Sequence, residues 1–270
     1  MAPMSPDEIK AAREILAFYV EAGVDAVLEE EPVDRLAASD RAEPAPEPPP
    51  AAAPVRPQRE ARARPVAPPT PEAATMAARE ASRRAASLEE LRAILEGFEG
   101  CPLKTTARQL VFADGIPGSR VMLVGEAPGR EEDLEGRPFV GPSGQLLDRM
   151  LAAIGLSRQH DAYIANVIPW RPPGNRTPTP HEQQICLPFI VRHIELADPD
   201  FLVCLGAPST AALLGVKEGI TKVRGRWFSY RTGRDIRALP TLHPAYLLRQ
   251  PLAKRLAWRD FLALRKALDG

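Results

Sequence analysis

Four side chains of different chemistry stand at separate points of the chain, each beside a glycine, a proline or a predicted strand end. They are a carboxylate, an aromatic ring, an amide and an imidazole: Glu126, Phe139, Asn166 and His243. A carboxylate can orient or deprotonate water, an amide donates and accepts hydrogen bonds at once, and a histidine can donate to a developing anion. Each type also has a structural alternative, namely a tight turn, a core ring, a turn amide and a histidine that caps a neighbouring carbonyl.

Further residues of the same segments could hold a polyanion. Leu247 and Leu248 form an apolar tip after His243 that could fill a gap in a base stack, and Arg249 follows with a guanidinium for a phosphate. Ser143-Gly144 stands where a helix is expected to begin, which leaves free backbone N–H groups for a phosphate.

The elements that must position these residues alternate between strands and helices. We expect buried strands at 120–124, 162–167, 201–206, 226–230 and 236–242, and helices at 87–98, 146–154, 180–196 and 252–268, with a short one from Ser209. This alternation predicts a parallel sheet covered on both faces. Glu126, Asn166 and His243 follow predicted strand ends, the edge where such folds bind ligands, so they can converge.

The motifs at 125–129, 137–141, 165–167 and 243–249 resemble, in their order and sequence, those of the uracil-DNA glycosylase superfamily, most closely its family 4. The resemblance extends from about Glu99 to Leu268. The resemblance implies an α/β fold, with three α/β/α layers around a central, mainly parallel four-stranded sheet. It also implies a monofunctional glycosylase that flips deoxyuridine out of DNA, hydrolyses its N-glycosidic bond and starts base-excision repair. Two rivals stay open: a glycosylase for another deaminated base such as hypoxanthine, and a non-catalytic lesion-binding module.

Within that resemblance each residue receives an expected role. Glu126 would act on water or the sugar cation, and His243 on uracil O2. Four residues would hold the base: Gly125, Glu132, Phe139 and Asn166. Of these, Phe139 would stack on the base, Asn166 would pair with O4 and N3–H, and Glu132 would help to exclude thymine's methyl group. The DNA contacts would be Ser143, Gly144, Arg171, Arg176, Leu247, Leu248 and Arg249.

The cysteines depart from the family pattern. Family 4 enzymes typically hold an iron–sulfur cluster on four cysteines, and the corresponding residues here are Phe98, Cys101, Trp170 and Cys186. Because a [4Fe–4S] cluster normally needs four ligands, we expect no cluster and no other metal. Phe98 and Trp170 would instead fill its space as an apolar plug.

Composition divides the 270 residues into three parts. An amphipathic helix is expected within 1–35, a Pro/Ala-rich disordered linker at 36–85 and the catalytic domain at 86–270. Residues 221–270 carry 12 Lys and Arg against 3 Asp and Glu, which favours a polyanionic partner. With three cysteines, no secretory signal and no apolar run long enough for a membrane span, we expect a cytoplasmic, nucleoid-associated monomer. The N-terminal helix could dock on the catalytic domain, recruit a protein partner or have no role, and our hypothesis is the protein partner.

Overall fold

The structure, a computed structural model, describes residues 71–270. The predicted helix within 1–35, its expected protein partner and the linker as far as residue 70 lie outside the described residues. Among residues 71–270, no helix combines the length and apolar character needed to cross a membrane.

A six-stranded sheet forms the centre of the described part of the chain, in the order β1-β3-β2-β4-β6-β5. The bounds of its strands are β1 Asp114–Gly115, β2 Val121–Gly125, β3 Ala162–Asn166, β4 Phe201–Leu205, β5 Phe228–Arg231 and β6 Asp235–Thr241. The four central strands β3-β2-β4-β6 are parallel, and the two edge strands β1 and β5 are antiparallel to their neighbours. The α/β fold with a central parallel four-stranded sheet is thus confirmed, and β1 was not expected.

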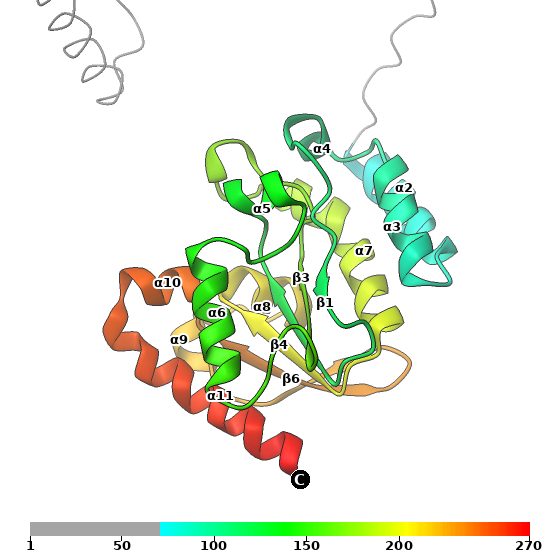
Figure 1. Cartoon of the computed structure of the whole chain (residues 1–270). Helices are drawn as coiled ribbons and strands as arrows, with labels where there is room; N and C mark the ends of the chain where they lie inside the picture. The colour runs from blue at the N-terminus through cyan, green and yellow to red at the C-terminus, as the bar shows by residue number, and fades with distance from the viewer. Residues whose placement is uncertain (1–70) are drawn as a thin grey trace, which may run out of the picture. The chain divides into compact units, whose positions relative to one another are not determined.

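Helices cover both faces of this sheet (Figure 1). The side chains of β2, β3 and β4 alternate between two buried clusters because successive residues of a strand point to opposite faces. Met122 and Val124 pack toward α2, α3 and α7, whereas Val121 and Leu123 pack toward α6 and α11. The helix bounds are α2 Pro71–Arg84, α3 Leu88–Gly97, α4 Pro102–Thr106, α5 Arg130–Glu135, α6 Pro142–Ala152, α7 Pro180–Ala197, α8 Ala207–Leu214, α9 Ile220–Val223, α10 Pro244–Arg249 and α11 Lys254–Asp269, with short 3₁₀ turns η2 Pro173–Asn175 and η3 Pro251–Ala253.

Helix caps account for several of these boundaries. Ser87 accepts a hydrogen bond from the backbone N–H of Glu90 and so begins α3 where the sequence predicts it. Thr179 and Glu182 form a reciprocal capping box at the start of α7. These local signals explain why both helices begin at the expected residues.

The expected linker is too long at its C-terminal end, because residues 71–84 form helix α2. Four alanines at helical spacing are buried on this helix and just beyond it: Ala74, Ala78, Ala81 and Ala85. Small side chains allow α2 to lie close against α7, and Arg192 of α7 donates two hydrogen bonds to the carbonyl of Ala85 at 3.0 and 2.8 Å. The alanine-rich composition that resembled a linker is therefore a helix-packing surface.

Candidate active site

The carboxyl ends of the parallel strands bring the predicted residues together. Gly125 at the end of β2 pairs in register with Asn166 at the end of β3, and Glu126 follows directly. On the other side of β2, strand β4 leads into Gly206, and β6 leads through Leu242 into His243. Four segments distant in sequence therefore meet at one edge of the sheet.

A cavity of about 710 Å³ opens at this edge. Its wall includes the acidic, aromatic, amide and imidazole side chains identified from the sequence: Glu126, Phe139, Asn166 and His243. A segment not predicted to contribute also borders it, with Ile220 and Thr221 at the start of α9, and Tyr246 of the predicted 243–249 motif adds a further ring. The cavity is thus a mixed polar and aromatic pocket at the ligand-binding edge of an α/β sheet.

Two residues of the cavity wall each have a buried side-chain oxygen without a hydrogen bond. Oε1 of Glu126 and Oδ1 of Asn166 are the buried side-chain polar atoms that have no partner among residues 71–270. Burial also raises the pKa of Glu126. Because nearly all buried polar atoms in folded proteins are paired, these two are poised to receive hydrogen bonds from a ligand or water.

Gly125 is required by its packing against the amide of Asn166 and the ring of Phe139. A Cβ at this position would overlap Oδ1 of Asn166 and would lie 2.7 Å from the ring of Phe139. Any larger residue would displace one of these two side chains. The glycine therefore has a steric role in the base-binding set expected from the sequence.

Phe139 combines its two alternative roles. The side chain is 5% exposed and packs in the core cluster beside Leu147 and Leu151, as a core ring would. The same ring borders the cavity, and its centroid lies 5.5 Å from that of His243. Its backbone is left-handed, with φ at +55°, which is unusual for a residue other than glycine.

His243 is held as a neutral ring with a defined tautomer. Its Nδ1 accepts a hydrogen bond from the backbone N–H of Ala245 at 3.1 Å, which caps α10. Burial, with a smaller contribution from the nearby Arg249, lowers the pKa of His243 to about 4. Because Nδ1 accepts, the proton of the neutral ring is on Nε2, which is left as a donor.

Comparison with known proteins places this site in a family. A family model described as the uracil DNA glycosylase superfamily matches residues 112–262, which include Glu126, Asn166 and His243. The chain belongs to the uracil-DNA glycosylase superfamily. It is similar to the type-4 uracil-DNA glycosylase of Thermotoga maritima, with 46% identity over 150 residues that cover 55% of this chain and 77% of the relative. The type-4 enzymes of Archaeoglobus fulgidus and Saccharolobus solfataricus are 37% and 39% identical, covering 65% and 63% of this chain and 90% and 81% of the relatives.

Within this uracil-DNA glycosylase fold, Glu132 has a structural task that the sequence did not predict. Its Oε2 accepts the N–H of Gly129 at 3.0 Å, and its Oε1 accepts those of Val140 and Gly141 at 3.1 Å. The side chain borders the cavity, but backbone groups engage both of its oxygens. Glu132 thus joins two loops of the cavity wall, and its expected help in excluding a methyl group stays a prediction.

The start of α6 also has an internal explanation. A Cβ on Gly144 would overlap the carbonyl oxygen of Phe139, so packing requires this glycine. Ser143, one residue earlier, is half-buried and borders the cavity. A phosphate contact at Ser143 stays a prediction, whereas Gly144 is already accounted for by the close approach of α6 to Phe139.

The apolar tip is corrected in one residue. Residues 244–249 form helix α10 rather than an extended loop, so neighbouring side chains face different directions. Leu247 is 1% exposed and packs against Leu146, Leu242 and Ala257, whereas Leu248 is 40% exposed. Leu247 therefore belongs to the core, and the candidate wedge is Leu248, followed by the exposed Arg249.

Both arginines of the 171–176 loop have partners inside the protein. Arg176 donates to the carboxylate of Glu182 at 2.9 and 2.6 Å and borders the cavity. Arg171 donates to Oδ1 of Asn175 at 2.7 Å and lies 3.9 Å from a carboxylate oxygen of Asp133. Arg176 borders the cavity, whereas Arg171 does not, and a DNA contact stays a prediction for both.

The four residues at the family's cluster positions lie in one buried apolar cluster. Sγ of Cys101 and Sγ of Cys186 are 3.8 Å apart, and the ring of Phe98 contacts Phe189 at a centroid distance of 5.0 Å. Trp170 is 1% exposed in the same cluster. Two thiols and two apolar rings do not fit an iron–sulfur cluster, which normally needs four ligands. Over residues 71–270, no group of three or more potential metal ligands is present.

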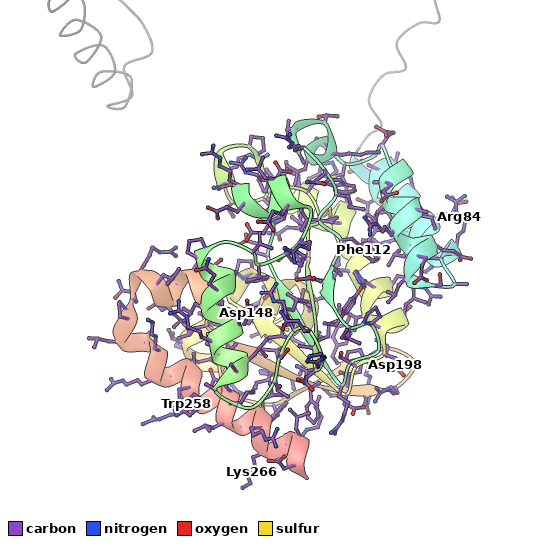
Figure 2. The ribbon with its side chains drawn as sticks, viewed as in Figure 1. Arg84, Phe112, Asp148, Asp198, Trp258 and Lys266 are labelled. Atoms are coloured by element: carbon purple, nitrogen blue, oxygen red, sulfur yellow. The ribbon has the colours of Figure 1, made fainter. Side chains whose placement is uncertain are left out.

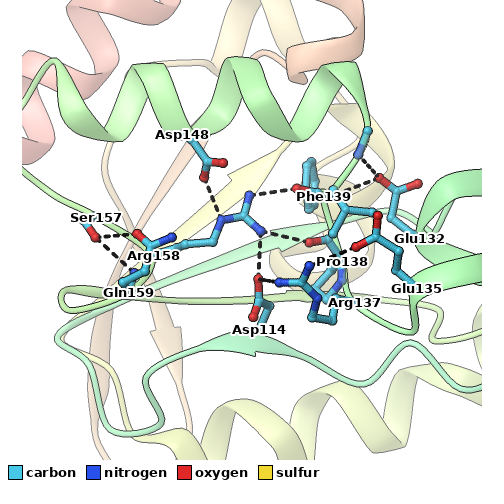
Figure 3. Close-up of polar contacts among 12 residues, drawn as sticks. Asp114, Glu132, Glu135, Arg137, Pro138, Phe139, Asp148, Ser157, Arg158 and Gln159 are labelled. Atoms are coloured by element: carbon cyan, nitrogen blue, oxygen red, sulfur yellow. Dashed lines mark hydrogen bonds and ion pairs between the residues drawn. The ribbon is translucent and has the colours of Figure 1, made fainter.

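Sequence reasoning missed Arg158, whose guanidinium contacts the backbone of Phe139, a residue that borders the cavity (Figure 3). It is 7% exposed, donates to Asp148 at 2.6 Å and Asp114 at 2.9 Å, and reaches the carbonyls of Pro138 and Phe139 at 3.2 and 2.7 Å. The sequence offered no signal for this network, because a single arginine between α6 and β3 resembles a surface charge.

Proposed function

We propose that this chain is a monofunctional uracil-DNA glycosylase that hydrolyses the N-glycosidic bond of deoxyuridine in DNA and starts base-excision repair. The observation that carries the proposal is the pair of unpartnered buried oxygens, one on a carboxylate and one on an amide, at one cavity. A flipped uracil and an attacking water would supply the missing hydrogen bonds. The type-4 names of the relatives support the same activity.

Asn166 is the residue proposed to read the base. Its free Oδ1 would accept from uracil N3–H, and its amide nitrogen would donate to O4. Cytosine presents the reverse arrangement at these two positions, so it would leave buried polar groups unpaired. Such a mismatch can discriminate by about 10⁴-fold or more.

Glu126 is proposed to act on the water side of the bond. Hydrolysis builds positive charge on the sugar and negative charge on the departing base. An ionised Glu126 would orient or deprotonate the water and stabilise the sugar cation, and its free Oε1 is available for this contact.

His243 is proposed to act on the base side. Its neutral ring carries the proton on Nε2, as the hydrogen bond from Ala245 to Nδ1 requires. That N–H would donate to uracil O2 as negative charge develops there, a type of contact worth about 3 to 4 kcal/mol at the transition state. Phe139, beside the imidazole, would stack on the base.

The surface around α10 is proposed to hold the opened duplex. Leu248 and Tyr246 are 40% and 37% exposed, and Arg249 beside them borders the cavity. Leu248 would fill the gap left by the flipped nucleotide, and Arg249 would contact a phosphate. Arg176 and Ser143 border the same cavity and would contribute further backbone contacts.

Substitutions of the two neighbouring leucines should distinguish a residue that inserts into the duplex from a residue of the core. We expect Leu248→Ala to reduce uracil release from duplex DNA about tenfold, while release from single strands, which need no wedge, stays within about twofold. We expect Leu247→Ala to lower the free energy of unfolding by about 2 to 5 kcal/mol, since it leaves a cavity in the core. Denaturant unfolding and release assays on both substrates measure these effects. An unaltered duplex rate in Leu248→Ala would exclude the wedge.

The activity itself is tested by uracil release from a labelled U·G duplex, scored by alkaline strand cleavage. Release of free uracil supports the proposal. Activity on hypoxanthine but not on U·G, U·A or single-stranded uracil would favour the other base specificity. Binding to uracil-containing DNA with no base released from any of these substrates would favour a recognition module.

We further propose that the enzyme works without an iron–sulfur cluster, because Phe98 and Trp170 occupy the space of two ligands and pack in the apolar core. We expect protein expressed with iron to lack absorbance near 400 nm and to contain less than about 0.1 iron per chain, against the four of a [4Fe–4S] centre. A brown protein whose colour disappears in Cys101→Ser would contradict this.

The proposed activity also suggests a cellular location and an oligomeric state. Because its substrate is chromosomal DNA, we propose that the enzyme acts at the nucleoid in the cytoplasm. The set of Glu126, Asn166 and His243 comes from one chain, which supports action as a monomer.

A further inference from the structure

The backbone of Phe139 needs help to keep its conformation. A left-handed φ of +55° crowds the Cβ of a residue other than glycine, so it persists only where neighbouring groups hold it. The residue lies between two proline-containing segments, Arg137-Pro138 and Gly141-Pro142, with no regular secondary structure of its own. The contacts that hold it must therefore come from elsewhere in the fold.

Two buried side chains of opposite charge form hydrogen bonds with the three peptide groups around Phe139. Arg158 donates to the carbonyls of Pro138 and Phe139 at 3.2 and 2.7 Å. Glu132 accepts from the next two N–H groups, those of Val140 and Gly141, at 3.1 Å each. The carbonyl side and the amide side of this segment are thus fixed independently.

The charge of Arg158 is balanced in place. Asp148 of α6 accepts from its Nε at 2.6 Å, and Asp114 of β1 accepts from its Nη1 at 2.9 Å (Figure 3). A buried guanidinium is tolerated only when its charge is paired. Here the two carboxylates orient the planar guanidinium so that its remaining N–H groups point toward the two carbonyls. The otherwise unexpected strand β1 supplies one of these carboxylates.

The orientation of the Phe139 ring bears directly on base binding. The ring lies against Gly125, whose Cβ, if present, would be 2.7 Å away, and its centroid is 5.5 Å from that of His243. A rotation of the backbone at Phe139 would therefore move the ring relative to the imidazole and to the amide of Asn166. The ring and the polar groups act on one base only if this geometry is kept.

We propose that Arg158 is a positioning residue for uracil capture, which it serves by holding Phe139 in its left-handed conformation. The inference rests on the proposed glycosylase function. It predicts that loss of Arg158 weakens base binding and base release together, while contacts with undamaged DNA persist.

The test compares Arg158→Met with Arg192→Met. Arg192 is a matched control because it also bridges a carbonyl and a carboxylate, Ala85 and Glu195, but far from the cavity. We expect Arg158→Met to lower kcat/KM at least tenfold and to raise the inhibition constant of free uracil by a similar factor. The Kd for a uracil-free duplex should stay within twofold. Arg192→Met should lower Tm and leave kcat/KM and uracil inhibition within twofold.

A double-mutant cycle with Phe139→Ala identifies the route of the effect. If Arg158 acts through Phe139, Arg158→Met should lower kcat/KM by less than threefold in the Phe139→Ala background. Equal losses in both backgrounds would overturn the proposal, as would a folded Arg158→Met enzyme with unaltered kcat/KM and uracil inhibition. Should Arg158→Met not fold, Arg158→Lys keeps the charge but not the fork, and the same cycle is measured with it. An inactive wild type would instead contradict the proposed function, so the two failures are distinct.

Discussion

Replacement of Glu126 by glutamine should lower kcat/KM for uracil release from a U·G duplex by about 10²- to 10⁴-fold. Glutamine keeps the shape of the side chain but cannot accept a proton or balance a sugar cation. The free Oε1 shows that no neighbouring group within the described residues already uses this oxygen. Single-turnover kinetics on the same duplex measure the effect without interference from product release.

The control is Glu131→Gln, which removes an exposed carboxylate from the first turn of α5, outside the cavity lining. This variant should retain wild-type kcat/KM within about twofold, because surface substitutions away from a site change little. If Glu126→Gln releases uracil as fast as Glu131→Gln does, the carboxylate has no chemical role and the proposed mechanism is wrong.

The pH dependence gives an independent signature of Glu126. Burial raises the pKa of this carboxyl above the ordinary value of a glutamate, so it stays protonated to a higher pH than an exposed glutamate. If the ionised form is active, kcat/KM rises with pH through this raised pKa and then levels off. His243, with a pKa of about 4, is already neutral over most of that range. The rising limb should therefore disappear in Glu126→Gln and persist in Glu131→Gln.

Replacement of Asn166 by aspartate should reduce the preference for uracil over cytosine by about 10⁴-fold. The carboxylate accepts but does not donate, so it opposes uracil O4 and suits the amino group of cytosine. Asn166 is 5% exposed, and burial makes an unpaired polar group costly. The measured quantity is the ratio of kcat/KM for uracil and cytosine in otherwise identical duplexes.

Asn166→Ala is the companion variant, since it removes the hydrogen-bonding pattern without reversing it. It should slow uracil release with no gain on cytosine. The Kd for a uracil-free duplex should be the same in both variants and in the wild type. A wild-type uracil preference in Asn166→Asp would show that another group reads the base.

The convergence of Glu126, Asn166 and His243 could be predicted because it depends on short-range signals. Buried strands of branched residues end in glycine or polar residues, and the carboxyl ends of parallel strands meet at one edge. The neutral state and tautomer of His243 could not be predicted in this way. They depend on burial and on the N–H of Ala245, which only the folded turn at α10 brings to Nδ1.

Helices α2 and α10 show where prediction from the local sequence fails. The residues of α2 lie in a stretch whose composition resembles the preceding linker, and its buried alanines acquire meaning only against α7. In α10, the helical turn rotates Leu247 into the core and leaves Leu248 outside, whereas an extended tip would have presented both. A third example is Trp258 of α11, which is 43% exposed and lies on the outer side of the molecule (Figure 2). The helical spacing of apolar residues alone would not place so large an apolar side chain at the surface.

The sequence by itself determined the fold class, five of the six strands in their order, the main helices between them, and three of the polar groups at the cavity. Tertiary structure decided which partners the remaining candidates have. Glu132 became a backbone clamp because the chain brings Gly129, Val140 and Gly141 around its carboxylate. Arg158 became its counterpart because Asp114 and Asp148, distant in sequence, neutralise it beneath Phe139. Such partners are selected by long-range packing, which residue spacing along the chain does not encode.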